Sequence, residues 1–283
     1  MTPALNDLTI EEIEKIIYDI NQEKYRAGQI FKWIYKGARD FAEMTDLPAG
    51  LRTRLNEVAF IGRLDLVEKR ISGDKETVKY LFGLNDGNVI ESVLMRYRHG
   101  NTVCVSSQVG CGMACVFCAS ASVGFKRNLR AWEIVDQAVS IQSISGERVC
   151  NIVVMGIGEP MNNYDNVIKA LKLLNHPQGL NISFRKMTVS TCGIVPGILR
   201  LSEEGMPVTL SVSVHAPDDE TRSRMMPVNS IYGISDVLEA CDIYARRTGR
   251  RVTLEYVLIN GINDDDCKAR ALAGRIRGMN CNV

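Results

Sequence analysis

Three cysteines stand close together in the segment Cys111-Gly-Met-Ala-Cys115-Val-Phe-Cys118, a C-x3-C-x2-C pattern. Three thiolates on one short loop can hold three irons of a 4Fe–4S cluster, whose usual complement is four cysteines. The fourth iron would then be open to another ligand. Zinc is the alternative, but it prefers four ligands and typically a second C-x2-C pair, which the sequence lacks, so that Cys150 or His176 would have to serve. The pattern therefore favours an iron–sulfur cluster with one free corner.

The distribution of the other cysteines argues against a disulfide framework. The chain has 283 residues and nine cysteines, of which none falls in the first 103 positions and four fall between 104 and 118. An odd cysteine count and an acidic N-terminus without a secretory pattern are typical of a reducing compartment. The hydrophobic fraction of 46% excludes a disordered chain, and no apolar run approaches the length of a membrane span. We expect a soluble, cytoplasmic protein that does not contact a membrane.

The charge balance does not identify a partner. Lys and Arg number 34 and Asp and Glu number 33, so the net charge is +1. That balance excludes the global basic bias typical of many nucleic-acid-binding domains. Contact with RNA or DNA would have to come from local basic clusters, such as residues 96–99 and 246–251, and each cluster taken alone is typical of a solvated face.

The first 107 residues predict helices followed by antiparallel strands. Apolar residues between Leu8 and Ile20 recur near the helical period, and Thr9 is a candidate N-cap. Further helices are expected near 27–35 and after Pro48. From 61 to 107, four short segments rich in Val, Ile, Leu and Tyr are separated by turn sequences, at 63–71, 77–84, 89–95 and 102–107. These patterns predict β-hairpins.

From Trp132 onward, strands alternate with helices. Strands are expected at 151–155, 186–190, 208–214 and 252–258, and helices at 132–145, 165–174, 196–204, 235–246 and 264–277. Regular alternation of this kind predicts parallel strands joined by right-handed crossovers, hence an α/β fold with an open or closed barrel. In such folds the chemistry gathers at the carboxyl ends of the strands.

A glycine-rich segment follows the first of these strands. In Gly156-Ile-Gly158-Glu159-Pro160 the glycines let the backbone approach a ligand, and Glu159 offers a carboxylate to an ammonium group. A plain strand-to-helix turn is the alternative. The segment is therefore a candidate ligand-binding turn.

Hydroxyl and imidazole groups end the next two predicted strands. Ser190 ends one, and Ser213-Val214-His215 ends the other. Such groups can hydrogen bond a ribose or a carboxylate, although a core histidine with satisfied hydrogen bonds is the alternative for His215. By residue type alone, Glu91 reads as an exposed strand carboxylate and Cys104 as a small buried core residue.

In this context the C-x3-C-x2-C segment resembles the radical S-adenosylmethionine (SAM) superfamily. More narrowly, the chain resembles the RlmN/Cfr group of RNA adenine methyltransferases, and Gly-Glu-Pro at 158–160 is more similar to RlmN than to Cfr. The resemblance extends from the N-terminal helices to the last residue. It is carried by Val103-Cys-Val-Ser-Ser-Gln-Val-Gly-Cys111, Gly124-Phe-Lys-Arg-Asn-Leu129, Met155-Gly-Ile-Gly-Glu-Pro-Met-Asn-Asn163, Val189-Ser-Thr-Cys-Gly-Ile-Val-Pro196, Ser211-Val-Ser-Val-His-Ala-Pro217, Arg224-Met-Met-Pro-Val-Asn229 and Glu255-Tyr-Val-Leu-Ile-Asn-Gly-Ile-Asn-Asp264.

The resemblance implies a fold, a domain organisation and a set of site residues. The fold would be a partial (βα)6 radical SAM barrel without its last strand and C-terminal tail. Residues 1–60 would form a helical RNA-docking domain, 61–100 an antiparallel β extension and 101–283 the radical SAM core. The implied cluster ligands are Cys111, Cys115 and Cys118, and the implied SAM contacts are Gly158, Glu159, Ser190, Ser213, Val214 and His215.

The implied reaction is methylation of C2 of adenine in large-subunit ribosomal RNA and in tRNA. One SAM would methylate a second cysteine, and another, cleaved at the cluster, would yield a radical that takes hydrogen from the new methyl group. The carbon radical would add to C2, and Cys104 would release the product by forming a transient disulfide with the second cysteine. Glu91 would be the proton acceptor. A flavodoxin-like protein would supply electrons, and the enzyme would be a monomer.

One part of the family pattern has no match. The methyl-carrying cysteine of the family lies in Gly-x-Asp-Ile-x-Ala-Ala-Cys-Gly-Gln, which residues 1–283 do not contain, and neither Cys267 nor Cys281 matches it. A SAM-binding asparagine is missing as well. We therefore expect a fragment or truncated form that binds the cluster and SAM without completing methylation. Two alternatives stay open: a radical SAM activating or maturation enzyme acting on a protein, and a metal-bearing RNA-binding module without turnover.

Overall fold

The computed structural model describes residues 2–283 and divides the chain into two compact units. The first comprises the residues up to Val105 together with Leu129–Ile152 and Asp165–Ser183. The second comprises Ser106–Asn128, Val153–Tyr164 and Phe184–Val283. Strands and helices occur in both units, so the predicted α/β class is confirmed.

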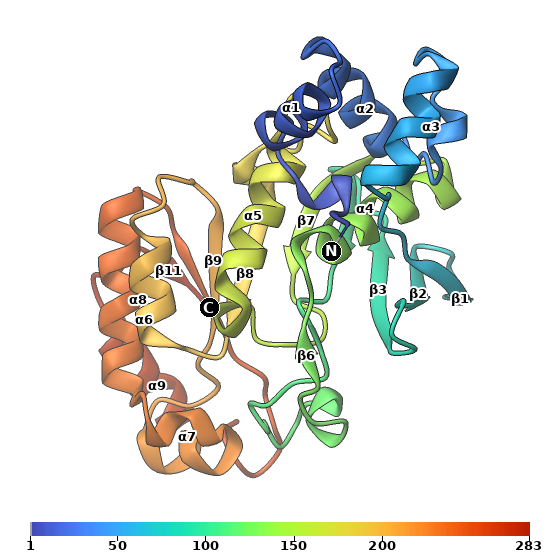
Figure 1. Ribbon diagram of the computed structural model, residues 1–283. Helices are drawn as coiled ribbons and strands as arrows, with labels where there is room; N and C mark the ends of the chain where they lie inside the picture. The colour runs from blue at the N-terminus through green and yellow to red at the C-terminus, as the bar shows by residue number, and fades with distance from the viewer. Residues whose placement is uncertain (1) are drawn as a thin grey trace. The chain divides into compact units, whose positions relative to one another are not determined.

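The first unit begins with the predicted helices, α1 (Ile10–Asp19), α2 (Tyr25–Tyr35) and α3 (Ala49–Val58) (Figure 1). Short 3-10 turns lie at Leu5–Asp7 and Phe41–Glu43. The predicted cap at Thr9 is confirmed, because its hydroxyl accepts the Glu12 N–H while the Glu12 carboxylate accepts the Thr9 N–H. This reciprocal pair satisfies two of the free N–H groups with which a helix begins.

The strands of the first unit follow the order β1-β2-β3-β4-β7. They are β1 (Asp65–Ile71), β2 (Thr77–Gly83), β3 (Val89–Met95), β4 (Asn101–Cys104) and β7 (Val149–Val154), and the pairings from β1 to β4 are antiparallel as predicted. Buried residues alternate along β2 and β3, as a sheet covered on one face requires. The helices that follow are α4 (Ala131–Ser145) and α5 (Tyr164–Asn175).

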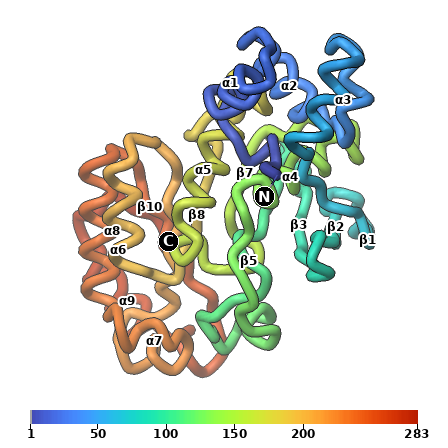
Figure 2. Tube along the Cα trace, in the orientation of Figure 1, coloured from blue at the N-terminus to red at the C-terminus, as the bar shows by residue number. Residues whose placement is uncertain are grey.

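The second unit has a parallel set of strands in the order β8-β9-β10-β11. They are β8 (Met187–Thr191), β9 (Thr209–Ser213), β10 (Val252–Glu255) and β11 (Cys281–Asn282). The helices are α6 (Val195–Leu201), α7 (Asp219–Met225), α8 (Ile234–Thr248) and α9 (Asp266–Arg275). Helices α6 and α8 pack together on the same side of these strands (Figures 1 and 2). The predicted βα alternation is confirmed, whereas α7 was not predicted.

The cysteine segment, residues 110–126, belongs to the second unit, and its two ends meet at a narrow neck. Strand β5 (Gln108–Val109) pairs antiparallel with β6 (Arg127–Asn128), and the segment between them carries the 3-10 turn Ala119–Ser122. The strand predicted at 102–107 ends earlier in the structure, at Cys104. Ser107, which was predicted to end that strand, donates its N–H to the Ile157 carbonyl and lies outside β4.

Gly110 makes the closure of this neck possible. Its φ is +71°, and a Cβ there would lie 1.7 Å from the Gly124 carbonyl oxygen. Any other residue would have to open the neck, since backbone cannot yield as a side-chain end does.

Within the described part of the chain, no helix is long and apolar enough to cross a membrane.

We expect Gly110→Ala to destabilise the protein far more than a matched glycine change. Gly146 ends α4 at nearly the same φ, +70°, but has nothing within 4 Å of an added Cβ. Gly146→Ala should cost about 1 kcal/mol through backbone strain alone. Gly110→Ala adds the clash and should cost roughly 3 kcal/mol or more. Urea denaturation of both variants measures this difference, and equal costs would contradict the role of the Gly110–Gly124 contact.

Candidate functional site

The three thiols of the cysteine segment line one cavity of about 140 Å³ in the second unit. The rest of the wall comes from the segments that follow β7, β8 and β9. The structure thus brings together seven of the predicted site residues, namely Cys111, Cys115, Cys118, Gly158, Glu159, Ser190 and Ser213. The carboxyl ends of parallel strands meet at one edge, which is where a ligand site is expected in an α/β fold.

The thiols hinder one another's ionisation. Burial, and after it the neighbouring Cys118 and Cys111 thiols and the Glu159 carboxyl, together raise the pKa of Cys115 to about 11. Burial also raises the pKa of Cys111, although the backbone N–H groups of Met113 and Gly158 oppose this shift. A cationic group bound between the thiols would remove the repulsion and favour the thiolates.

The donor set fits an iron–sulfur cluster. Among residues 2–283, no three His, Cys, Asp or Glu side chains converge on a point where one metal ion could bind. A cluster does not require such convergence, because each of its irons takes a thiolate of its own. Three thiols spread around one cavity therefore suit a cluster.

Glu159 is buried at the bottom of the site, with 3% of its surface exposed. Its carboxylate accepts the N–H groups of Met161 at 3.0 Å and of Cys192 at 2.8 Å. Burial raises its pKa. The carboxylate thus already joins the turn Pro160–Asn163 to the end of β8, and the side chains of Thr191 and Cys192 also hydrogen bond to it.

The backbone at Gly158 lies close to the side chain of Gln108, whereas its approach to a ligand stays a prediction. Its φ is +110°, and an added Cβ would lie 2.6 Å from the Cβ of Gln108. Gln108 in turn accepts the Glu159 N–H through Oε1 at 2.8 Å and donates to Asn128 at 2.7 Å. Gly158 is therefore required to set Glu159 against the neck of the cysteine segment.

His215 follows β9 and contacts the cysteine segment directly. Its ring meets Phe117 edge-on, with the ring centroids 4.7 Å apart. Its Nδ1 accepts the Val257 N–H at 3.0 Å, so the neutral ring carries its hydrogen on Nε2. Burial lowers the pKa of His215 to about 4. Val214 and His215 are not among the residues lining the cavity, but Phe117 is.

The other two predicted residues belong to the first unit. The Glu91 carboxylate forms an ion pair with Lys79 at 2.7 Å, beside a hollow of about 180 Å³ that Glu68, Arg70 and Leu81 also line. Cys104 ends β4 in register with Val93, and its thiol is partly buried and free of disulfides. Their catalytic roles stay predictions.

Several residues of the site were not predicted. Thr191, Cys192 and Met226 line the cavity, Gln108 accepts the Glu159 N–H behind it, and Arg222 is buried. Cys192 and Met226 lie within segments that carry the family resemblance, so position alone could have indicated them. Arg222 has no such signal, because an arginine on a short helix is typically exposed.

The acid stability of the protein should depend on His215. In the unfolded chain its pKa is about 6.5, and burial holds it at about 4 in the folded state. Between pH 6.5 and pH 4 only the unfolded state takes up a proton on His215. The contribution of the neutral histidine to the free energy of unfolding is therefore present above pH 6.5 and is lost as pH falls toward 4. The loss should be about 3 kcal/mol.

His215→Gln should remove this component. The free energy of unfolding of the variant, measured at both ends of this pH range, should fall less than that of the unaltered chain by about 3 kcal/mol. His99→Gln, at an exposed histidine, is the control and should leave the acid loss unchanged. An unchanged loss in His215→Gln would show that the histidine is not held neutral.

Comparison with known proteins identifies the family. Residues 105–272 match the family model described as the radical SAM superfamily, and residues 4–61 match the ribosomal RNA large subunit methyltransferase N-terminal domain. A relative from Thermoanaerobacter sp. (strain X514), named probable dual-specificity RNA methyltransferase RlmN, is 49% identical over 99% of this chain and 82% of its own length. A relative of the same name from Lachnoclostridium phytofermentans is 50% identical over 98% of this chain and 78% of its own length.

A solved structure agrees with these matches. The crystal structure of a radical SAM methyltransferase from Sphaerobacter thermophilus has a TM-score of 0.95 and 45% identity, covering 99% of this chain and 83% of that one. The radical SAM superfamily implies a 4Fe–4S cluster and SAM. The predicted fold and family are therefore confirmed: the chain belongs to the RlmN-type dual-specificity RNA methyltransferases of the radical SAM superfamily.

Proposed function

We propose that this protein methylates C2 of adenine in large-subunit ribosomal RNA and in tRNA, in the cytoplasm, as a monomer supplied with electrons by a flavodoxin-like protein. The observation that carries the proposal is the shared cavity of Cys111, Cys115 and Cys118 at the carboxyl ends of the strands of the second unit. C2 of adenine is not nucleophilic, so ordinary methyl transfer from SAM cannot reach it and radical chemistry is needed.

The cysteine segment supplies the ligands. Cys111, Cys115 and Cys118 would each hold one iron of the cluster, which would leave one iron without a cysteine ligand. When bound, the cluster and SAM supply the one-electron cleavage that starts the radical reaction. The protein's part is to hold the three thiols apart in a partly buried cavity, which the neck at Gly110 and the contact of Phe117 with His215 accomplish.

The strand ends supply the SAM contacts. The Glu159 carboxylate lines the cavity and offers a negative charge to the SAM ammonium group, and Gly158 lines the cavity beside it. The hydroxyls of Ser190 and Ser213 face the same cavity and suit the ribose or the carboxylate. The neutral His215, with its hydrogen on Nε2, is a donor beside Val214.

Glu91 and Cys104 complete the proposed chemistry. Glu91 accepts the proton that leaves adenine C2, and the Lys79 ammonium forms an ion pair with its carboxylate at 2.7 Å. Cys104 forms a transient disulfide with a methyl-carrying cysteine, which releases the methylated RNA. The Cys104 thiolate attacks the sulfur of the second cysteine, so the S–S bond forms as the bond from that sulfur to the RNA methylene carbon breaks, and this carbon keeps the electron pair and takes up a proton to become the methyl group.

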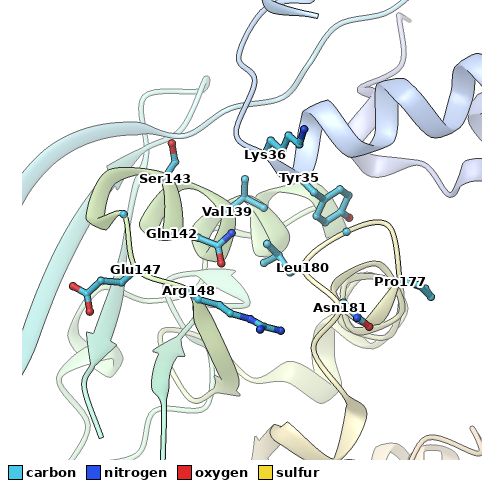
Figure 3. A pocket seen from close by; sticks show the side chains of 12 residues that line it. Tyr35, Lys36, Val139, Gln142, Ser143, Glu147, Arg148, Pro177, Leu180 and Asn181 are labelled. Atoms are coloured by element: carbon cyan, nitrogen blue, oxygen red, sulfur yellow. The ribbon is translucent and has the colours of Figure 1, made fainter. Parts of the chain in front are cut away.

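The proposed domain division has three parts: a helical domain at 1–60, a β extension at 61–100 and a radical SAM core at 101–283. RNA contacts are proposed for the helical domain and for basic side chains near it in the first unit. A hollow of about 780 Å³ in the first unit lies beside the end of α2 (Figure 3). Lys36 and Arg148 are exposed around it, whereas Glu147 is engaged by Arg96 and adds little free negative charge. Two cations around an open polar hollow suit an RNA backbone phosphate.

The function predicts products that depend on the three cysteines. The anaerobically reconstituted chain should bind iron and sulfide and should cleave SAM to 5′-deoxyadenosine under a strong reductant. With the family's Gly-x-Asp-Ile-x-Ala-Ala-Cys-Gly-Gln segment attached, it should form 2-methyladenosine in ribosomal RNA and tRNA. Cys111→Ala should lower both activities by roughly 100-fold or more, because one iron loses its ligand.

Cys267→Ala is the matched control, since Cys267 is an exposed cysteine on α9 outside the cavity, and it should leave both activities unchanged. Three outcomes would contradict the proposal. The first is tightly bound zinc without iron, which would favour a metal-bearing module. The second is SAM cleavage by the extended chain while the RNA stays unmethylated, which would favour a protein substrate. The third is full activity of Cys111→Ala.

Loss of the two cations around the first-unit hollow should weaken RNA binding in a salt-dependent way. In the double variant Lys36→Gln/Arg148→Gln, tRNA affinity should fall roughly tenfold at low salt. The slope of log affinity against log salt should become shallower by about 2, one for each lost phosphate contact. Filter binding across a salt series measures both, with exposed Arg251→Gln in the second unit as control. An unchanged slope would exclude this hollow from RNA binding.

A further inference from the structure

Arg222 carries a fully buried positive charge, and no carboxylate among residues 2–283 forms a direct hydrogen bond or salt bridge with it. It lies on α7 with 0% of its surface exposed. Its Nη atoms donate to the carbonyls of Cys192 at 2.7 Å, Tyr232 at 3.1 Å and Ser213 at 3.2 Å, and to Asn229 Oδ1 at 2.7 Å. Within residues 2–283 its buried Nε has no partner. All its partners are neutral groups.

The Asp219 carboxylate attracts Arg222 across a distance but is hydrogen bonded to it only through a relay. Asn229 accepts from Arg222 and donates through Nδ2 to Asp219 Oδ1 at 3.0 Å, so an amide separates the two charges. A buried charge without an ion-pair partner costs several kcal/mol. Burial accordingly lowers the pKa of the Arg222 guanidinium, yet arginine stays protonated in proteins. Such a cation indicates an anion that binds beside it.

The place of Arg222 indicates which anion this is. Cys192 and Ser213, whose carbonyls it holds, both line the cavity of the three cluster cysteines. The cysteine segment also bonds to the same helix, since the Val116 N–H donates to the Met225 carbonyl at 3.0 Å. The charge of Arg222 lowers the pKa of the Cys115 thiol, against the larger effect of burial.

We propose that Arg222 is the counter-charge of the iron–sulfur cluster and that it favours the reduced state of the cluster. The inference rests on the proposed function, because it requires a cluster on Cys111, Cys115 and Cys118. The oxidised core has charge two plus, so with three thiolates the site is singly negative. One electron from a low-potential one-electron donor makes it doubly negative, and no bond or proton changes. A fixed positive charge stabilises the more negative state and so raises the reduction potential.

Two substitutions at Arg222 separate charge from hydrogen bonding. Arg222→Gln removes the charge and Arg222→Lys keeps it, while both lose most bonds of the guanidinium. Arg224→Gln, at an exposed arginine on the same helix, is the control. Each variant is reconstituted anaerobically without SAM, and a potentiometric titration followed by electron paramagnetic resonance gives the reduction equilibrium constant. In Arg222→Gln the reduction equilibrium constant should fall about tenfold or more, which is 59 mV for one electron. In Arg222→Lys and Arg224→Gln this constant should not change.

A second variant leaves Arg222 in place. D219N/N229D exchanges the two side chains of the relay, so that a carboxylate contacts Arg222 directly while the net charge of the chain is conserved. This variant should also lower the reduction equilibrium constant, and it decides the question if Arg222→Gln fails to fold.

An unchanged constant in Arg222→Gln, or an equal fall in Arg222→Lys, would overturn the inference, as would an unchanged constant in the relay variant. Failure of the unaltered chain to take up iron and sulfide would instead overturn the proposed function. The two failures are therefore distinguishable.

Discussion

Three thiols confined in one cavity are the constraint on which the rest of the second unit depends. They oppose one another's ionisation, and burial adds to that opposition, so that the pKa of Cys115 reaches about 11. A ligand set of thiolates must nevertheless be deprotonated when metal binds. Positive charge within the site offsets the free-energy cost of this deprotonation. Backbone N–H groups of Met113 and Gly158 supply part of it at Cys111, and the buried Arg222 guanidinium acts on Cys115.

The second unit holds the cysteine segment at three separate points. The close approach of Gly110 and Gly124 fixes the two ends of the segment, and the hydrogen bond from the Val116 N–H to the Met225 carbonyl fixes its middle. The ring contact of Phe117 with His215 is the third point. These points belong to different elements, so the thiol positions depend on the tertiary structure of the whole unit rather than on the loop alone. The same elements present Glu159 and the strand-end serines to the cavity.

Periodicity predicted the elements that bury one face. The helix at Ile10–Asp19, the strands Thr77–Gly83 and Val89–Met95 and the parallel strands of the second unit each repeat apolar residues at the spacing of their own geometry. The spacing of cysteines and glycines likewise indicated the site. The two-residue strands β5 and β6 are too short for any period to show. Helix α7 was missed because it buries an arginine, which hydrophobic patterns place at the surface.

His215 and Arg222 show two solutions to burying a basic group at the same edge of a sheet. The ordinary pKa of histidine lies near neutrality, so burial simply removes the proton, and the neutral ring accepts from Val257 while keeping a donor on Nε2. Arginine cannot lose its proton in the same way. Its charge is instead spread over three carbonyls and an amide, none of which neutralises it. Acid can therefore change the charge of His215, whereas the field of Arg222 persists at every pH at which the protein is folded. A counter-charge for a low-potential centre must have this permanence, because the reduction equilibrium would otherwise vary with pH.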